Sequence, residues 1–187
     1  MRSNRSDFVP DLMIHKVPEI PFRELARRGL ADYIFDLDNT LVPRKALKAP
    51  QENVRTLSDA RIMDWIRSLI ILSNVVVDRK WAFWGPSRVA RVETLARQFE
   101  ADYLTCVWPN LKPKPAVFHA AARQINATPG RIVVVGDQVS TDIAGGNRAS
   151  YFTILVDPIG TDNLVTAIRR SLVEPRIRLS TRYGSIQ

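Results

Sequence analysis

The chain has 187 residues, a length that typically folds as one compact domain with a substantial buried core. Its hydrophobic fraction of 45% and charged fraction of 25% are ordinary for a globular protein. The net charge of +8 and the pI near 10.1 are not ordinary, and they indicate attraction to polyanions. Nucleic acid, anionic lipid headgroups and phosphorylated substrates all meet that description, and charge alone does not choose among them.

The residues that usually hold disulfides or zinc are scarce. A single cysteine, Cys106, excludes an internal disulfide and is compatible with a reducing compartment. With His15 and His119 as the only histidines, a zinc site would need carboxylates at unusual spacing. The basic start of the chain enters no sustained apolar region, and the apolar runs are far shorter than the ~20 residues that span a bilayer. We therefore expect a soluble or peripheral protein, cytoplasmic and able to bind the inner face of a membrane.

Short apolar runs alternate with amphipathic segments along the chain. Strands are predicted over 31–35, 69–72, 103–107, 132–135 and 151–156; helices are predicted over 22–28, 53–68, 88–99, 115–126 and 162–172, with a short one around Asp142. In the second helix, the inner face is assigned to Val54, Leu57, Ile62 and Trp65. The alternation predicts an α/β fold, with a parallel sheet covered by helices on both faces.

This pattern divides the chain into three parts. Residues 1–30 are a proline-punctuated segment expected to pack on the core, and 31–174 form the α/β domain. Residues 175–187 form a basic tail that we expect to be loosely held.

Polar residues follow the predicted strands at their carboxyl ends. They are Asp36 and Asp38, Ser73 and Asn74, Lys112, and Asp137. Ligands of open α/β sheets bind beyond these strand ends, so we expect the set to gather at one edge. Each member is of a residue type suited to phosphoryl transfer.

The carboxylates match the needs of phosphate ester hydrolysis. A phosphate monoester carries about two negative charges, and Mg²⁺ held by carboxylate oxygens offsets them. Asp36 and Asp137 can supply those oxygens, together with the backbone carbonyl of Asp38. Asp36 can also attack phosphorus to form an aspartyl-phosphate. Asp38 can then protonate the leaving alkoxide and later activate water.

The remaining candidates would contact the phosphoryl group or support the metal. Ser73 and Lys112 can donate hydrogen bonds to phosphoryl oxygens, where charge spreads in the transition state. For Asn74 two roles stay open: a contact to the phosphate or capping of the backbone. Asp142 can orient metal-bound waters or replace one of them. Lys114 competes with Lys112 for the cationic role, and the motif register favours Lys112.

Four segments, in order, resemble the motifs of the haloacid dehalogenase (HAD) superfamily of phosphatases. Asp36-Leu37-Asp38-Asn39-Thr40-Leu41-Val42 resembles the first and Ser73 the second; Lys112-Pro113-Lys114-Pro115-Ala116-Val117-Phe118 resembles the third and Gly136-Asp137-Gln138-Val139-Ser140-Thr141-Asp142 the fourth. The resemblance implies a three-layer Rossmann-like HAD core with Asp36 as nucleophile and Mg²⁺ as cofactor.

Further segments resemble the YqeG-like branch of subfamily III. They are Phe8-Val9-Pro10-Asp11-Leu12 and the stretch 136–148. That branch is similar to mitochondrial phosphatidylglycerophosphate phosphatase, which implies the removal of the terminal phosphate of that lipid at an anionic membrane. The sequence departs from the pattern where three valines follow Asn74 and where the loop over 78–86 is long.

The gaps between motifs leave no room for a cap domain. Residues 41–72 and 74–111 are each long enough only for core helices and a strand. An uncapped site suits a phosphate at the end of a large molecule, and the basic charge suits a phospholipid headgroup or a nucleic-acid end.

Two alternatives to a lipid phosphatase stay open. One is a phosphatase of nucleic-acid ends, nucleotides or another phosphorylated substrate, and the other is a non-catalytic protein that binds membranes or partners through its basic surface. Trp81, Phe83 and Trp84 fit either core packing or an aromatic rim at a lipid interface. The oligomeric state does not follow from the sequence.

Overall fold

The computed structural model describes residues 7–75 and 87–160. The predictions for Trp81, Phe83 and Trp84, for the helix over 162–172 and for the tail over 175–187 lie outside the described residues. None of the described helices is both long and apolar enough to cross a bilayer.

A six-stranded parallel sheet forms the centre of the molecule. Its strands are β1 (Leu12–Ile14), β2 (Asp32–Phe35), β3 (Ser68–Asn74), β4 (Asp102–Cys106), β5 (Ile132–Gly136) and β6 (Phe152–Val156). Their order across the sheet is β1-β6-β5-β2-β3-β4, and every neighbouring pair is parallel. The predicted α/β fold is confirmed, and all carboxyl ends lie along one edge.

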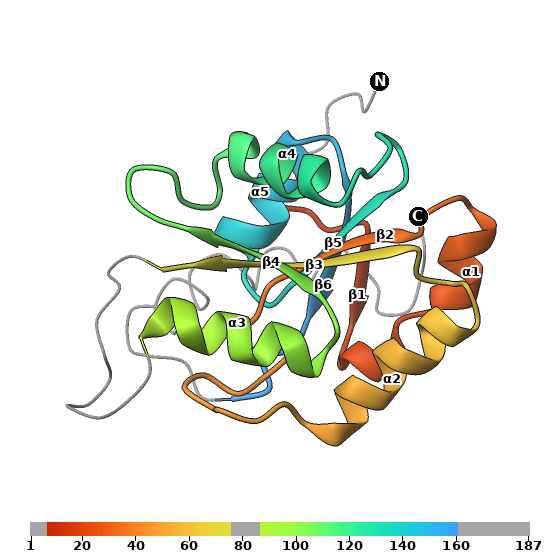
Figure 1. The fold of residues 1–187 in the computed structure, drawn as a ribbon. Coiled ribbons are helices and arrows are strands. Elements are labelled where there is room, and N and C mark those ends of the chain that lie inside the picture. The colour runs from red at the N-terminus through yellow and green to blue at the C-terminus, as the bar shows by residue number, and fades with distance from the viewer. Residues whose placement is uncertain (1–6, 76–86, 161–187) are drawn as a thin grey trace.

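Helices cover both faces of this sheet and make three layers (Figure 1). They are α1 (Phe22–Arg27), α2 (Gln51–Ile62), α3 (Arg88–Gln98), α4 (Pro115–Gln124) and α5 (Ala144–Arg148), with short turns η1 (Val17–Glu19) and η2 (Val139–Ile143). Helices α1, α2 and α3 lie on one side, and α4 and α5 on the other. The arrangement is Rossmann-like.

The central strands β2, β3 and β5 consist mainly of apolar residues because both faces of the sheet are buried there, whereas the edge strand β4 is only partly buried and includes Asp102 and Thr105. In β2, Tyr33 and Phe35 pack into the core beneath α1, α2 and α3, while Ile34 packs into the core beneath α4. The alternation of side chains along a strand sends neighbours to opposite layers. This explains why the runs read as continuous rather than alternating hydrophobic patterns.

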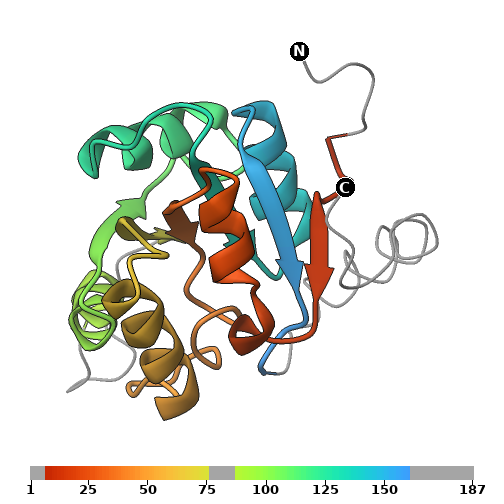
Figure 2. The same ribbon diagram turned by 90° about the vertical axis from the view of Figure 1, so that its right-hand side faces the viewer.

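The first strand was not predicted. β1 lies beside β6 at the sheet edge, as Figure 2 shows, and it has only three residues. Asp11 fixes it there: its Oδ2 accepts hydrogen bonds from the backbone N and the Oγ1 of Thr153, at 2.8 and 3.2 Å. A strand this short gives no detectable period, so pairing with β6 decides its conformation.

The second helix is shorter than predicted. α2 ends at Ile62, and Asp64 adopts φ 57°, which turns the chain out of the helix. Its buried face consists of Asn53, Leu57 and Ala60, whereas Ile62 is 75% exposed. The assignment of Ile62 to the inner face was therefore wrong, because positions 53, 57 and 60 share one helical face and 62 lies away from it.

Candidate active site

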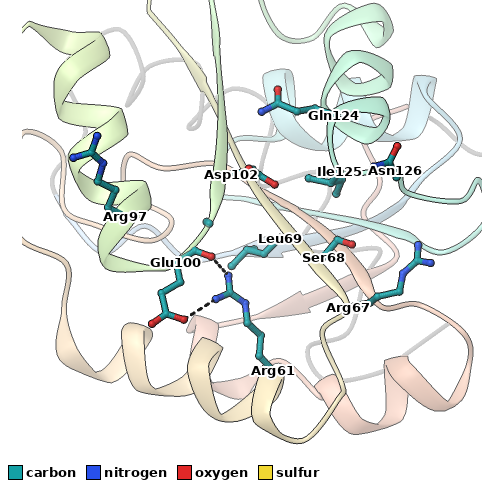
Figure 3. A pocket seen from close by; sticks show the side chains of 11 residues that line it. Arg61, Arg67, Ser68, Leu69, Arg97, Glu100, Asp102, Gln124, Ile125 and Asn126 are labelled. Carbon is teal, nitrogen blue, oxygen red and sulfur yellow. Dashed lines mark hydrogen bonds and ion pairs between the residues drawn. The ribbon is translucent and has the colours of Figure 1, made fainter.

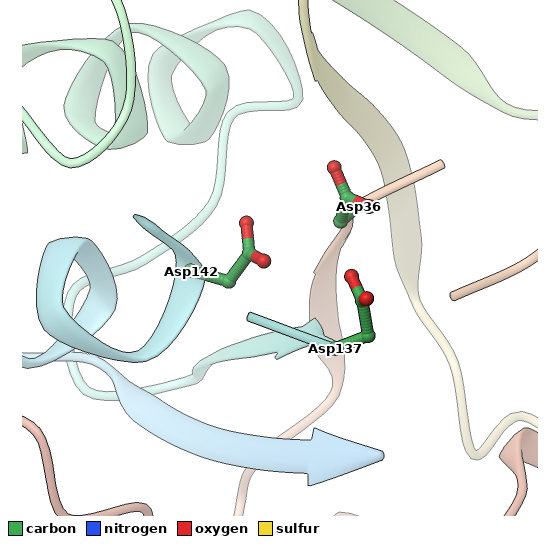
Figure 4. A group of neighbouring side chains, drawn as sticks. All are labelled: Asp36, Asp137 and Asp142. Atoms are coloured by element: carbon green, nitrogen blue, oxygen red, sulfur yellow. The ribbon is translucent and has the colours of Figure 1, made fainter. Parts of the chain in front are cut away.

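Three carboxylates meet at the carboxyl edge of the sheet. Asp36 follows β2 and Asp137 follows β5, and these strands are neighbours in register, with Phe35 opposite Val135. Asp142 comes from η2, which follows β5 and Asp137 directly in the chain. One oxygen from each of the three carboxylates lies within 4.8 Å of the others, as drawn in Figure 4. Strand order thus brings together residues separated by a hundred positions in the sequence.

Lys112 places its ammonium among these acids. The Nζ atom lies 2.5 Å from Asp36 Oδ1 and 2.7 Å from Asp142 Oδ1, and the residue is buried. Lys114 is exposed instead, and its Nζ donates to the carbonyl of Pro109. Of the two lysines weighed in the sequence, the structure brings Lys112 into the site.

Asn74 uses its amide on the backbone of Lys112. The backbone N of Lys112 donates to Asn74 Oδ1 at 2.9 Å, and Asn74 Nδ2 donates to the Lys112 carbonyl at 3.4 Å. These contacts hold the β4–α4 loop against the end of β3. They favour the capping alternative for Asn74, and its phosphate contact stays a prediction. Ser73 is buried at the same strand end, opposite Thr105 in β4.

Asp38 lies at the site but joins a different partner from the metal cluster. Its Oδ1 accepts a hydrogen bond from Arg91 Nη2 at 2.8 Å, and its side chain is 32% exposed. The cluster of carboxylates that could share a cation does not include the Asp38 side chain. This is compatible with the prediction that only its backbone carbonyl would face a metal.

Sequence reasoning missed two residues of this region. Arg91 was left in the amphipathic pattern of α3, with no role, and Thr40 was left inside the first motif. Thr40 Oγ1 donates to Asp137 Oδ1 at 3.4 Å, and both side chains are buried. The signal for Thr40 was its place beside the strand-end acids, whereas nothing in the sequence marks Arg91 as a partner of Asp38.

Burial shapes the charges of the central pair. Desolvation raises the pKa of Asp36 to about 7, and the ammonium of Lys112 opposes this rise. Desolvation also disfavours the Lys112 cation, but the carboxylates of Asp142 and Asp36 outweigh it and raise the pKa of Lys112. Lys112 therefore stays charged, and Asp36 is the group in which a proton and a cation compete.

The donor set fits a hard divalent cation. All three candidate ligands offer carboxylate oxygens, the ligand type that Mg²⁺ prefers. Three ionised carboxylates and one ammonium together carry a charge of −2, which a divalent ion would neutralise. Asp36, Asp137 and Asp142 are thus the described residues suited to hold Mg²⁺.

Gly136 makes room for Asp142. A Cβ at this position would lie 2.4 Å from the Cβ of Asp142, so no larger residue fits without displacement. Asp142 is held there because its Oδ2 accepts hydrogen bonds from the backbone N of Gln138 and from Thr141 Oγ1, each at 3.2 Å. The Gly-Asp pair after β5 thus sets the positions of two acids.

A second hollow lies at the opposite edge of the sheet. This cavity of about 620 Å³ is bordered by the starts of β3 and β4 and the ends of α2, α3 and α4 (Figure 3). Its arginines are already paired: Arg61 with Glu100, Arg67 with Asp32 and Arg97 with Glu93. The carboxylates and lysine that could do chemistry are at the other edge.

Comparisons with known proteins agree with this geometry. The HAD-hydrolase-like family matches residues 111–162, which include Lys112, Asp137 and Asp142. The chain is 28% identical to "Probable phosphatase YqeG" of Bacillus subtilis, over 96% of this chain and 95% of that protein. It is 24% identical to the chloroplastic/mitochondrial phosphatidylglycerophosphate phosphatase 1 of Arabidopsis thaliana, over 83% of this chain and 42% of that protein.

A solved structure supports the fold. An uncharacterized protein from Listeria monocytogenes superposes with a TM-score of 0.51 at 19% identity, covering 67% of this chain and 78% of that one. The family match over residues 111–162 and the two named phosphatases make the chain similar to HAD-type phosphatases. Its parallel α/β core, with aspartates at the ends of adjacent strands, agrees with that similarity.

Proposed function

We propose that this protein is a Mg²⁺-dependent phosphatase in which the Asp36 carboxylate is the nucleophile. The observation that carries the proposal is the meeting of Asp36, Asp137 and Asp142 around Lys112 at the carboxyl edge. Mg²⁺, when bound, would offset the charge of the phosphoryl group and allow an anionic nucleophile to approach. Asp36, Asp137 and Asp142 would hold it.

The first displacement transfers the phosphoryl group to the protein. An oxygen of Asp36 attacks phosphorus, the bond from phosphorus to the ester oxygen breaks, and the leaving alkoxide takes a proton from Asp38. Lys112 and Ser73 would donate to the equatorial phosphoryl oxygens, where negative charge spreads in the transition state. Asn74 supports this role by holding the backbone of Lys112 through two hydrogen bonds.

The second displacement releases phosphate. Asp38, now ionised, takes a proton from a water molecule as that water attacks phosphorus, and the bond from phosphorus to Asp36 breaks. The products are inorganic phosphate and the free carboxylate of Asp36. Asp38 regains the proton it gave to the alcohol, so the cycle closes.

The nucleophile is tested with p-nitrophenyl phosphate. We expect Asp36→Asn to lose about a thousandfold or more in kcat, because an amide cannot form the acyl-phosphate. A chelator should abolish the activity of the natural protein and Mg²⁺ should restore it. Circular dichroism should show both proteins folded, and substantial turnover by Asp36→Asn would disprove the nucleophilic role.

The proposed substrate is phosphatidylglycerophosphate at an anionic membrane. The named activity of the Arabidopsis relative and the net charge of +8 support it. A further support is the exposed turn after β4, in which Val107 is 51% and Trp108 75% exposed. Amphipathic rings such as tryptophan settle at lipid interfaces, and this turn precedes the site residue Lys112 by a few positions.

The substrate is tested by three parallel assays. We expect phosphatidylglycerophosphate in mixed micelles to be hydrolysed with a kcat/KM well above that for p-nitrophenyl phosphate. The third assay uses 5′- and 3′-phosphorylated oligonucleotides. Preferential hydrolysis of oligonucleotides, with a steep salt dependence, would replace the lipid by nucleic-acid ends. Equal rates on lipid and p-nitrophenyl phosphate would also refute the lipid assignment.

A further inference from the structure

Arg91 is a buried cation in the middle of α3. Its side chain is only 5% exposed, although arginine is almost never buried without a charged partner. Other arginines on the same helix behave differently: Arg97 is 77% exposed and pairs with Glu93 one turn away. The burial of Arg91 therefore calls for an explanation within its contacts.

Those contacts lead to the loop that carries the first motif. Arg91 Nη2 donates to Asp38 Oδ1 at 2.8 Å, and Arg91 Nε donates to the carbonyl of Ala46 at 2.9 Å. The guanidinium thus forms hydrogen bonds to two residues of the loop that follows β2. One of these is Asp38, whose carboxylate is the proposed general acid and base. Since the planar guanidinium presents its donors in fixed directions, it restricts the orientation of that carboxylate.

The loop itself is already held by its own backbone. Asn39 N donates to the Val42 carbonyl at 2.7 Å, and Leu41 N donates to the Leu37 carbonyl at 3.0 Å. These hydrogen bonds fix the backbone around Asp38 without Arg91. The guanidinium of Arg91 therefore acts on the side chain of Asp38 and fixes its orientation. One oxygen, Oδ1, is engaged, and the side chain remains 32% exposed toward solvent.

We propose that Arg91 is a positioning residue, which holds the Asp38 carboxylate where its second oxygen meets the ester oxygen of the substrate. The inference rests on the proposed function, because it assigns Asp38 the proton transfers. Arg91 itself touches no reacting atom. Its effect on turnover passes through Asp38.

The leaving group separates positioning from folding. p-Nitrophenolate departs without a proton, whereas an alkoxide needs one, so only alkyl esters depend strongly on a well-placed acid. We expect Arg91→Met, which nearly keeps the volume of the buried side chain, to lower kcat/KM for glycerol 3-phosphate about tenfold or more. The same variant should change kcat/KM for p-nitrophenyl phosphate by less than about threefold.

Controls come from the same helix and from the partner. Arg97→Met, at an exposed position of α3, should leave both rates unchanged. Arg91→Lys keeps the charge with a single donor atom and should restore part of the alkyl ester rate. In an Asp38→Ala background, Arg91→Met should add no further loss on the alkyl ester, since the residue it positions is gone.

The two proposals fail in different ways. If the natural protein hydrolyses neither ester in the presence of Mg²⁺, the proposed function fails. If it hydrolyses both and Arg91→Met lowers both rates by the same factor, the positioning role is overturned and Arg91 is structural. Thermal unfolding of each variant, measured beside the rates, should show the same folded fraction at the assay temperature. If Arg91→Met does not fold, Arg91→Lys is assayed on the two esters in its place. The proposal is overturned if the ratio of kcat/KM for glycerol 3-phosphate to kcat/KM for p-nitrophenyl phosphate is the same in Arg91→Lys as in the natural protein.

Discussion

Lys112 and Lys114 lie two residues apart in a Lys-Pro-Lys-Pro segment, yet their side chains differ in burial and in contacts. Lys112 is buried between Asp36 and Asp142, and Lys114 is exposed on the surface of the same loop. A buried ammonium beside the proposed nucleophile would stabilise charge on a phosphoryl group much more than an exposed one, since water does not screen it. The pair therefore provides a matched test of the site.

We expect Lys112→Ala to lower kcat/KM for p-nitrophenyl phosphate by about a hundredfold or more, the range for the loss of one preorganised donor. Lys114→Ala should stay within about threefold of the natural protein, because among the described residues its ammonium donates to a backbone carbonyl, that of Pro109. Steady-state kinetics on both variants measure this. A larger loss at Lys114 would place the phosphate contact there instead.

In the proposed metal site, the carboxyl of Asp36 would couple Mg²⁺ binding to pH. Burial raises its pKa to about 7 in the metal-free protein, far above the ordinary value of 3.8. Below that pKa a bound proton must leave before the carboxylate can hold a cation, so Mg²⁺ affinity should fall about tenfold per pH unit below 7 and level off above it. Isothermal titration from pH 5.5 to 8.5 measures the slope, and a flat profile would contradict it.

The same shift has a consequence for folding. The folded protein binds the proton of Asp36 more tightly than the unfolded chain does. Protonation of Asp36 therefore raises the free energy of unfolding at low pH, and this contribution is lost as pH rises from 3.8 to about 7. Denaturation of the metal-free protein across this range should show the loss. Saturating Mg²⁺ should restore stability at high pH, because the cation then replaces the proton.

At the scale of elements, the turn from β5 into η2 places two of the three acids. Gly136 closes β5, Asp137 follows it, and the absence of a side chain at Gly136 lets Asp142 fold back against the strand end. The spacing of the fourth motif therefore has a steric meaning. It brings the second acid within reach of the first.

Gly136→Ala should weaken Mg²⁺ binding by about ten- to a hundredfold, the range for lost support of a metal ligand, because the new Cβ displaces Asp142. Gly145→Ala is the control, since its Cβ would lie 2.1 Å from Phe118 in the core beneath α4. Both variants should lose about 1–3 kcal/mol of stability through overpacking. Only Gly136→Ala should change the Mg²⁺ titration, and equal affinities in the two would refute the steric explanation.

At the scale of the whole molecule, the two edges of the sheet carry different exposed apolar side chains. Trp108 and Val107 project from the carboxyl edge, where the site lies, while the exposed Ile62 and Met63 lie at the end of α2, on the other edge. Both pairs are apolar and solvent-exposed. Under the proposed lipid function, a membrane that presents the substrate at the site would contact the first pair and not the second.

Trp108→Ala should reduce co-sedimentation with phosphatidylglycerol vesicles severalfold and shift the binding curve to higher lipid concentration, because it removes an interfacial ring. Ile62→Ala removes an equally exposed apolar side chain from the far edge and should bind as the natural protein does. Phosphatidylcholine vesicles should bind both weakly. If Trp108→Ala and Ile62→Ala lose vesicle binding equally, the protein does not bind membranes through the edge that carries the site.

The alternation of strands and helices from β2 onward followed from the sequence, and so did the expectation that the acids at the strand ends gather at one edge. Apolar runs closed by Asp36 and by Gly136-Asp137 specify buried parallel strands, and parallel strands place their ends on one edge whatever the details of packing. Ser87 also behaves as its type predicts: its Oγ accepts a hydrogen bond from Ala90 N at 3.1 Å and caps α3.

Tertiary packing decided the rest. β1 exists because β6 offers it an edge, and α2 ends at Ile62 because Asp64 turns the chain. The partnership of Arg91 with Asp38 joins residues 53 positions apart. Local patterns carry the period of a helix or strand, but they do not say which distant charge a buried side chain will face. That choice depends on where α3 lies against the loop after β2, and only the three-dimensional arrangement of layers sets it.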